Sequence, residues 1–101
     1  MNEWIGKKVI VVSGLTERHI YYGTLTKISG HKTKLSNARI INYWTKSDKK
    51  IAKFATIGPQ KKNRITSIFI SDIIPSITVE WTEKILECTK QAIDNWEKLE
   101  A

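Results

Sequence analysis

The sequence predicts a mainly β protein: a small, five-stranded, bent barrel with a C-terminal amphipathic α-helix. Short apolar runs separated by turn-forming residues recur along residues 7–70, as is typical of closely spaced strands. The apolar period changes to three and four near the C-terminus, which indicates a helix. The chain of 101 residues is long enough for one domain with a core and too short for two.

Three strands are predicted in the first part of the chain. Residues 7–12 (KKVIVV) are β-branched and apolar, which is typical of a strand buried on both faces or central in a small sheet. Residues 20–28 predict a second strand, and Gly23 in its interior indicates strong bending, a bulge or a close backbone approach. After a Ser-Gly turn, a third strand is predicted over roughly residues 32–41.

Two more strands are predicted on either side of a basic loop. Residues 51–57 (IAKFATI) are apolar enough for a fourth strand, which a Gly-Pro pair stops. Residues 65–70 alternate imperfectly and predict a fifth strand, with Asp72 and Pro75 marking its end or a break.

The C-terminal apolar stripe has the spacing of one helix face. Its members are Ile85, Thr89, Ala92, Trp96 and Leu99. Thr82 suits the N-cap of this helix, with Glu83 favourable in the first turn, whereas a start at Thr89 with residues 85–88 as a last strand is the alternative. We divide this single domain into a barrel over residues 1–76 and a helical segment over residues 77–101, packed on the barrel or on a partner subunit.

Charge points to an anionic partner. Lys and Arg number 17 against 10 acidic residues, which gives a formal net charge of +7. This balance favours nucleic acid, phosphorylated metabolites or an acidic protein face. No apolar run approaches the roughly 20 residues that span a bilayer, and the N-terminus lacks the order of a signal peptide, so we expect no membrane association. The single cysteine, Cys88, fits a reducing cytoplasm.

Motifs of catalysis and metal binding are missing from the sequence. His19, His31 and Cys88 do not stand at the spacing of zinc ligands. There is no glycine-rich phosphate motif and no nucleophile elbow. We therefore expect a protein that is not an enzyme and needs no metal or cofactor.

The candidate binding surface centres on residues 35–44, a predicted strand that ends in two aromatic residues. Tyr43 and Trp44 stand beside cationic side chains, which offers stacking faces and positive charge to a nucleotide. By period two, Arg39 shares a face with Tyr43, so Tyr43 is the expected ligand partner and Trp44 the expected core residue. The candidate ligand-binding residues are Arg39, Tyr43, Trp44, His31, Lys46, Lys61, Lys62 and Arg64.

Structural alternatives stand beside this interpretation. The two aromatic residues could cap a small core with their polar tips in water, and Arg39 could form a salt bridge across the sheet. The cations of residues 60–64 could belong to a solvated loop. Trp81 and Trp96 are interpreted as core or interface anchors rather than as stacking platforms.

The first part of the chain resembles Sm-like proteins. The resemblance lies in the run from GKKVIVV to the bent strand with Gly23-Thr24-Leu25 and on to Leu35 and Ala38, with residues 65–77 as the second motif. It implies a five-stranded bent barrel of the Sm or SH3 type, which often assembles into rings through its edge strands. The Arg-Gly of the RNA clamp and the usual loop Asn are missing, and His31 and Lys32 stand in that loop.

Residues 37–44 (NARIINYW), with a later E-C-T-x-x-A at residues 87–92, resemble a group of short phage and prophage proteins. The resemblance implies a role in countering bacterial immunity, for example by sequestering a cyclic nucleotide signal. We therefore expect a non-catalytic protein that binds an anionic nucleotide ligand in the cytoplasm. A nucleic-acid-binding module and an inhibitor that contacts a host protein are the alternatives, and we expect a homo-oligomer formed through edge strands or the C-terminal helix.

Overall fold

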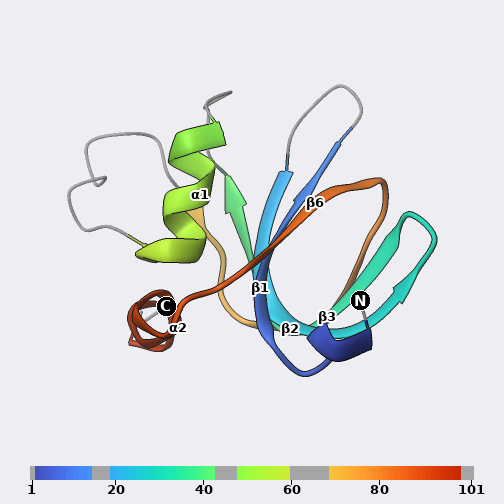
Figure 1. The fold of residues 1–101 in the computed structure, drawn as a ribbon, viewed down its shortest axis with the longest axis horizontal. Coiled ribbons are helices and arrows are strands. Elements are labelled where there is room, and N and C mark those ends of the chain that lie inside the picture. The colour runs from blue at the N-terminus through green and yellow to red at the C-terminus, as the bar shows by residue number, and fades with distance from the viewer. Residues whose placement is uncertain (1, 15–18, 43–47, 60–68, 99–101) are drawn as a thin grey trace.

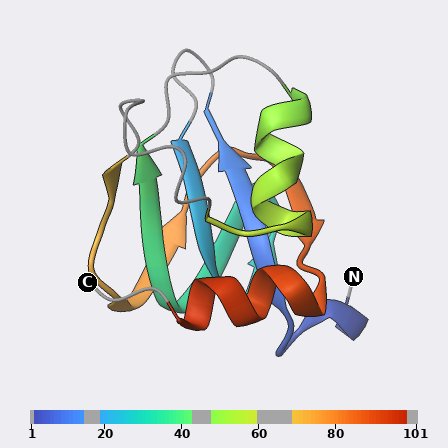
Figure 2. The same cartoon turned by 90° about the vertical axis from the view of Figure 1, so that its left-hand side faces the viewer.

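The computed structural model describes residues 2–14, 19–42, 48–59 and 69–98 of the chain. Its elements in chain order are η1 (Asn2–Trp4), β1 (Lys8–Ser13), β2 (His19–Ser29), β3 (Lys32–Asn42), α1 (Asp48–Thr56), β4 (Phe69–Ile70), β5 (Ile74–Val79), β6 (Thr82–Glu87) and α2 (Lys90–Glu97). The strands form one strongly bent antiparallel sheet with both helices on the same side of it (Figures 1 and 2). This arrangement confirms the predicted mainly β class with a C-terminal helix.

The sheet order is β4-β3-β2-β1-β6, and β5 also pairs with β3. Because β2 occupies one edge of β3 along its length, β4 and β5 both lie along the other edge. The six described strands therefore fill five positions, as in a small five-stranded barrel. The chain then crosses from β5 at one end of the sheet to β6 at the other (Figure 1).

The sheet bends at Gly23 of β2. The register with β3 shifts between Tyr22 and Thr24, and Asn37 on the opposing strand has a φ of 48°. A Cβ on Gly23 would lie 3.2 Å from the Cα and Cβ of Ala38, closer than ordinary packing allows. This β-bulge and close approach confirm what the glycine predicts.

The bend creates two apolar clusters on opposite faces of the sheet. Between the sheet and the helices lie Ile10, Val12, Ile20, Tyr22, Ile41, Ile51, Phe54, Ala55, Cys88, Ala92 and Trp96. Enclosed by the bent sheet itself lie Val9, Val11, Leu25, Leu35, Ala38 and Val79. Successive residues of β1 enter the two clusters alternately, which confirms the prediction that this strand is buried on both faces.

The predicted fourth strand, residues 51–57, is wrong, because this segment belongs to α1. Ile51, Phe54 and Ala55 are buried, at a spacing of three and four that places them on one helix face. The seven-residue apolar run shows too little of its period for helix and strand to be separated. Of the predicted fifth strand, residues 69–70 form β4, and residues 65–68 lie outside the described residues.

A helix that starts at Thr82 is also wrong, and the alternative start at Thr89 is confirmed. Residues 82–87 form β6 and pair with β1, since this edge of β1 needs a partner for its backbone groups. The Oγ1 of Thr89 caps α2 by accepting from the N–H of Ala92 at 3.1 Å. The sheet thus extends to residue 87, and the expected boundary at residues 76–77 falls inside β5.

The C-terminal end of α1 is capped by groups of α2. The indole Nε1 of Trp96 donates to the carbonyl oxygen of Phe54 at 2.9 Å, and the side-chain amide of Asn95 donates to the carbonyl oxygen of Ile57 at 2.7 Å. Thr89 donates its N–H to Ala55 at 2.8 Å and its hydroxyl to Thr56 at 2.7 Å. The last carbonyl groups of an α-helix generally lack an intrahelical donor, and here residues 89–96 supply donors to them. No helix among the described residues combines the length and apolar character needed to cross a bilayer.

Candidate functional site

The structure describes two of the predicted site residues. Tyr43, Trp44, Lys46, Lys61, Lys62 and Arg64 lie outside the described residues. Arg39 lies in the second half of β3, and His31 lies in the turn between β2 and β3, just before β3 begins. The structure therefore places these two residues near opposite ends of β3, and they do not form one site.

Arg39 is buried rather than presented to a ligand. Only 5% of the residue is exposed, and its Nη1 donates to the carbonyl oxygen of Ser71 at 3.0 Å. Ser71 is bonded to the backbone of Ile40 as well, through its N–H and its hydroxyl. The bulge near Asn37 lies before Arg39, so Arg39 shares a face with Ile41 as period two predicts, and this face is buried instead of exposed. Arg39 thus ties the segment after β4 to β3.

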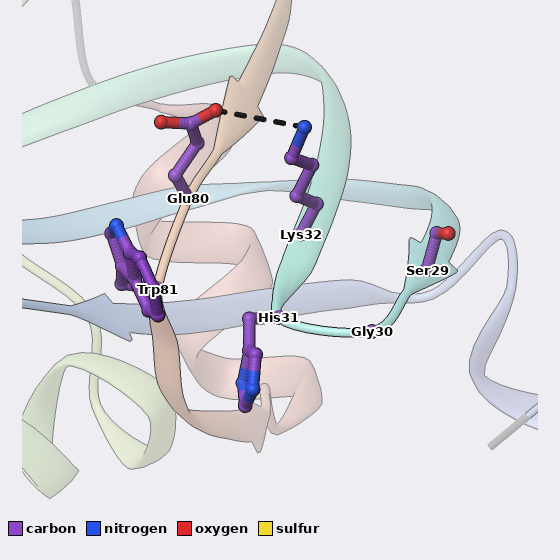
Figure 3. A pocket seen from close by; sticks show the side chains of 6 residues that line it. All are labelled: Ser29, Gly30, His31, Lys32, Glu80 and Trp81. Carbon is purple, nitrogen blue, oxygen red and sulfur yellow. Dashed lines mark ion pairs between the residues drawn. The ribbon is translucent and has the colours of Figure 1, made fainter.

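A hollow of about 380 Å³ lies where the β2–β3 turn meets the short connection between β5 and β6. It is lined by Ser29, Gly30, His31, Lys32, Glu80 and Trp81. Figure 3 shows the indole of Trp81 and the imidazole of His31 beside each other, with Lys32 and Glu80 on another side of the hollow. One predicted residue, His31, therefore belongs to a site that Trp81 dominates.

The two aromatic rings form a partly exposed stack. Their centroids are 5.7 Å apart with an angle of 27° between the planes, and 53% of Trp81 is exposed. Trp81 is therefore not a core residue, and its alternative role as an interface anchor stays a prediction, whereas Trp96, which is fully buried, is confirmed as a core anchor. An exposed tryptophan next to a second flat ring is a ready stacking surface for a base.

The backbone holds Trp81 in an unfavourable conformation. Its φ is 53°, in the left-handed region, which costs a residue with a side chain about 1–2 kcal/mol. Gly14 donates its N–H to the carbonyl oxygen of Trp81 at 3.2 Å, and the hydroxyl of Ser13 donates to that of Glu80 at 2.5 Å. Strained backbone held by its surroundings is often found at functional sites.

His31 is fixed to the same connection. The N–H of Thr82 donates to the carbonyl oxygen of His31 at 2.9 Å, and the hydroxyls of Thr33 and Thr82 are 2.7 Å apart. Thr33 is fully buried, so this bond joins β3 to β6 beneath the hollow. The relative position of the two rings is thereby set before any ligand arrives. The sequence signal for this site was Trp81 itself, which stands with Glu80 in a two-residue connection that contains no glycine.

The two charged side chains at the hollow, Lys32 and Glu80, form only a weak ion pair. The Nζ of Lys32 lies 3.7 Å from a carboxylate oxygen of Glu80, and both side chains are more than 60% exposed. An exposed ion pair of this length contributes about 0–1 kcal/mol, so an anionic ligand can compete for Lys32. Among the described residues there is no cluster of His, Cys, Asp and Glu that could hold a metal ion.

Two titratable side chains, those of Tyr22 and Cys88, are buried away from the hollow, in the cluster between the sheet and the helices. Burial raises the pKa of the Cys88 thiol to about 12, and burial also raises the pKa of the Tyr22 hydroxyl. Both groups are therefore protonated at neutral pH. Because a thiol reacts as its thiolate, burial in the core lowers the reactivity of Cys88.

Residues 6–96 match the family model of a domain of unknown function, DUF6948. The chain belongs to this family. Comparison with curated proteins and with solved structures found no significant match. The matched range contains every element of the sheet and almost all of α2, so both the fold and the hollow lie within the DUF6948 domain.

Proposed function

We propose that this DUF6948 domain is a non-catalytic binding protein for an anionic ligand that carries a flat base, the class to which nucleotides belong. The observation that carries the proposal is the stack of His31 and Trp81, in which a strained backbone holds an indole half in solvent. This conformation exposes the indole and destabilises the fold. A role of the indole in ligand binding would explain why the protein has it.

The size and charge of the hollow support this class of ligand. A volume of about 380 Å³ lies within the range of small-molecule sites, on the order of 300–1,000 Å³. Stacking of a base on an aromatic ring is worth about 1–3 kcal/mol. Lys32 at the rim provides a cation for a phosphate, and the net charge of +7 attracts anions over a longer range.

The chemistry of the lining supports binding without catalysis. The carboxylate of Glu80 lies beside the ammonium of Lys32 and away from the His31 ring, so the lining does not pair an acid with a base (Figure 3). We also assign the protein to the cytoplasm, since its one cysteine is free and buried.

The test is binding of mononucleotides to the purified protein. AMP, UMP and cyclic AMP, the last as a representative cyclic nucleotide signal, are titrated by calorimetry at low ionic strength. We expect Trp81→Ala to weaken the binding of whichever of them binds by about 5- to 150-fold, the equivalent of one lost stacking contact. Ile73→Ala is the matched control, because Ile73 is also about half exposed and lies at the other end of β5. Equal binding by the Trp81→Ala variant and the wild type would refute the proposal.

A further inference from the structure

We propose that the ligand is single-stranded nucleic acid, whose phosphates cross the sheet next to the hollow and contact a lysine pair, Lys27 and Lys34. The inference rests on the proposed function and extends it, since it names the ligand and adds a second contact region. This region is the outer face of β2, β3 and β5, opposite the cluster of Leu25, Leu35 and Val79.

Lys27 and Lys34 are direct cross-strand partners in the β2–β3 ladder. Both residues are exposed, and neither forms a salt bridge with a carboxylate of the described residues. Like charges placed directly opposite each other destabilise a sheet. A phosphate between the two ammonium groups would remove this repulsion, so the arrangement suits a bound anion.

The lysine pair is continuous with the hollow. Lys32 lines the hollow, and Lys34 lies two residues further along β3 on the same face, about 6.6–6.8 Å away. On the next strand, Thr78 is the partner of Lys34, and Ser76 is the partner of Ser36. Lysines and hydroxyl groups are common donors to phosphate oxygens. The face thus presents such donors along a path that begins at Lys32, on the rim of the hollow.

The length of this path favours a single strand over the other possible ligands. A mononucleotide in the hollow can place its phosphate near Lys32 but leaves the lysine pair unoccupied, whereas a strand of several nucleotides reaches both regions. A duplex does not fit the stacking site, because its bases are already stacked on each other. An acidic protein could neutralise the lysines, but it offers no base to the rings of His31 and Trp81.

The test compares two double variants that lose the same charge. Fluorescence anisotropy measures the binding of labelled 12-nucleotide oligo(dT) and oligo(U) between 50 and 200 mM salt. In the Lys27→Ala/Lys34→Ala variant we expect affinity at low salt to fall about 10-fold, and the slope of log K against log salt to shrink by roughly 1.4, for two lost phosphate contacts. The control, Lys53→Ala/Lys90→Ala, removes two exposed lysines of α1 and α2 and should change affinity less than about 2-fold.

Further measurements keep folding and mononucleotide binding separate from this result. The Tm of the Lys27→Ala/Lys34→Ala variant should not fall, because the substitution removes repulsion. Its affinity for UMP should equal that of the wild type. A preference for oligo(U) over oligo(dT), or the reverse, would identify the strand as RNA or DNA.

Four results would overturn the inference. The first is that the Lys27→Ala/Lys34→Ala variant and the Lys53→Ala/Lys90→Ala control bind the oligonucleotides with equal affinity. In that case the proposed function still stands if Trp81→Ala weakens the binding of UMP. The second is tighter binding of a 12-base-pair duplex than of the single strands. The third is polyglutamate that competes as well as an unlabelled oligonucleotide. The fourth, Trp81→Ala that binds UMP and both oligonucleotides as the wild type does, refutes the proposed function as well.

Discussion

The indole ring of Trp96 stacks on the ring of Tyr22, with centroids 4.6 Å apart and an angle of 12° between the planes. Trp96 belongs to α2 and Tyr22 to β2, and the indole N–H reaches a carbonyl oxygen of α1. One side chain thus joins both helices to the sheet. The C-terminal helix is consequently part of the core, into which it places Ala92 and Trp96.

Replacing Trp96 should cost more stability than any exposed substitution. We expect Trp96→Ala to lower the free energy of unfolding by about 3–5 kcal/mol, as is usual for a buried tryptophan. Trp96→Phe keeps an aromatic ring for Tyr22 but leaves the carbonyl oxygen of Phe54 without its donor, which should cost about 1–3 kcal/mol. Urea unfolding measures both values, and a Phe variant as unstable as the Ala variant would show that the ring stack contributes little.

Two substitutions at Trp81 should separate backbone strain from side-chain contact. Trp81→Ala keeps a Cβ at the positive φ, whereas Trp81→Gly relieves that strain of about 1–2 kcal/mol and adds about 0.5–1 kcal/mol of chain entropy cost. We therefore expect the Gly variant to be more stable than the Ala variant by up to about 1.5 kcal/mol in thermal unfolding. The opposite order would contradict the strained conformation.

Arg39 should behave as a structural residue. Removing its guanidinium leaves the carbonyl oxygen of Ser71 without a charged donor, so we expect Arg39→Ala to lose about 1.5–3 kcal/mol in urea unfolding. Lys53→Ala, at an exposed position of α1, is the matched loss of one charge and should change stability by less than about 0.5 kcal/mol. If Arg39→Ala and the wild type have the same free energy of unfolding, the structural role of Arg39 is refuted and its predicted role as a ligand contact is favoured.

Alkaline pH should destabilise the protein through its buried core groups. In the folded chain, burial holds the pKa of Cys88 at about 12, whereas its ordinary value is 9.0. The unfolded chain therefore releases this proton first, and the stabilisation present below pH 9 is lost as pH rises toward 12. The free energy of unfolding should fall over this window, and Cys88→Ala should make the fall shallower without abolishing it, since the pKa of Tyr22 is raised too. Parallel curves for both proteins would contradict this account.

The open edges of the sheet predict self-association. In the described sheet, β6 pairs only with β1, and β5 pairs only with β3, so each strand leaves one edge unpaired. Exposed edges of this kind readily pair with another chain. We expect light scattering at micromolar concentration to detect a dimer or larger assembly, and Ile77→Pro on β5 to dissociate it, because proline cannot donate to a ladder. A monomer at these concentrations would refute the homo-oligomer.

The sequence predicted what depends on local pattern. The run of valines and isoleucine in β1 indicated a strand buried on both faces, and Gly23 marked the bend. The Ile51–Phe54 segment was misassigned because seven residues show less than two helical turns, and the packing against α2 decides its structure. Exposure of Trp81 depends on a positive φ, and Arg39 is buried where it bonds Ser71 of a distant segment, and residue types alone reveal neither.

The capping of α1 by α2 has a consequence for synthesis. The carbonyl groups at the end of α1 receive their donors from Thr89, Asn95 and Trp96, which leave the ribosome more than thirty residues later. Until then α1 can bond these groups only to water, and a helix of this length has little stability of its own. Ribosome-bound chains that stop before α2 should therefore remain sensitive to protease in the α1 segment. Resistance should appear in a single step once Trp96 has emerged, so this domain completes its fold only after α2 has been made.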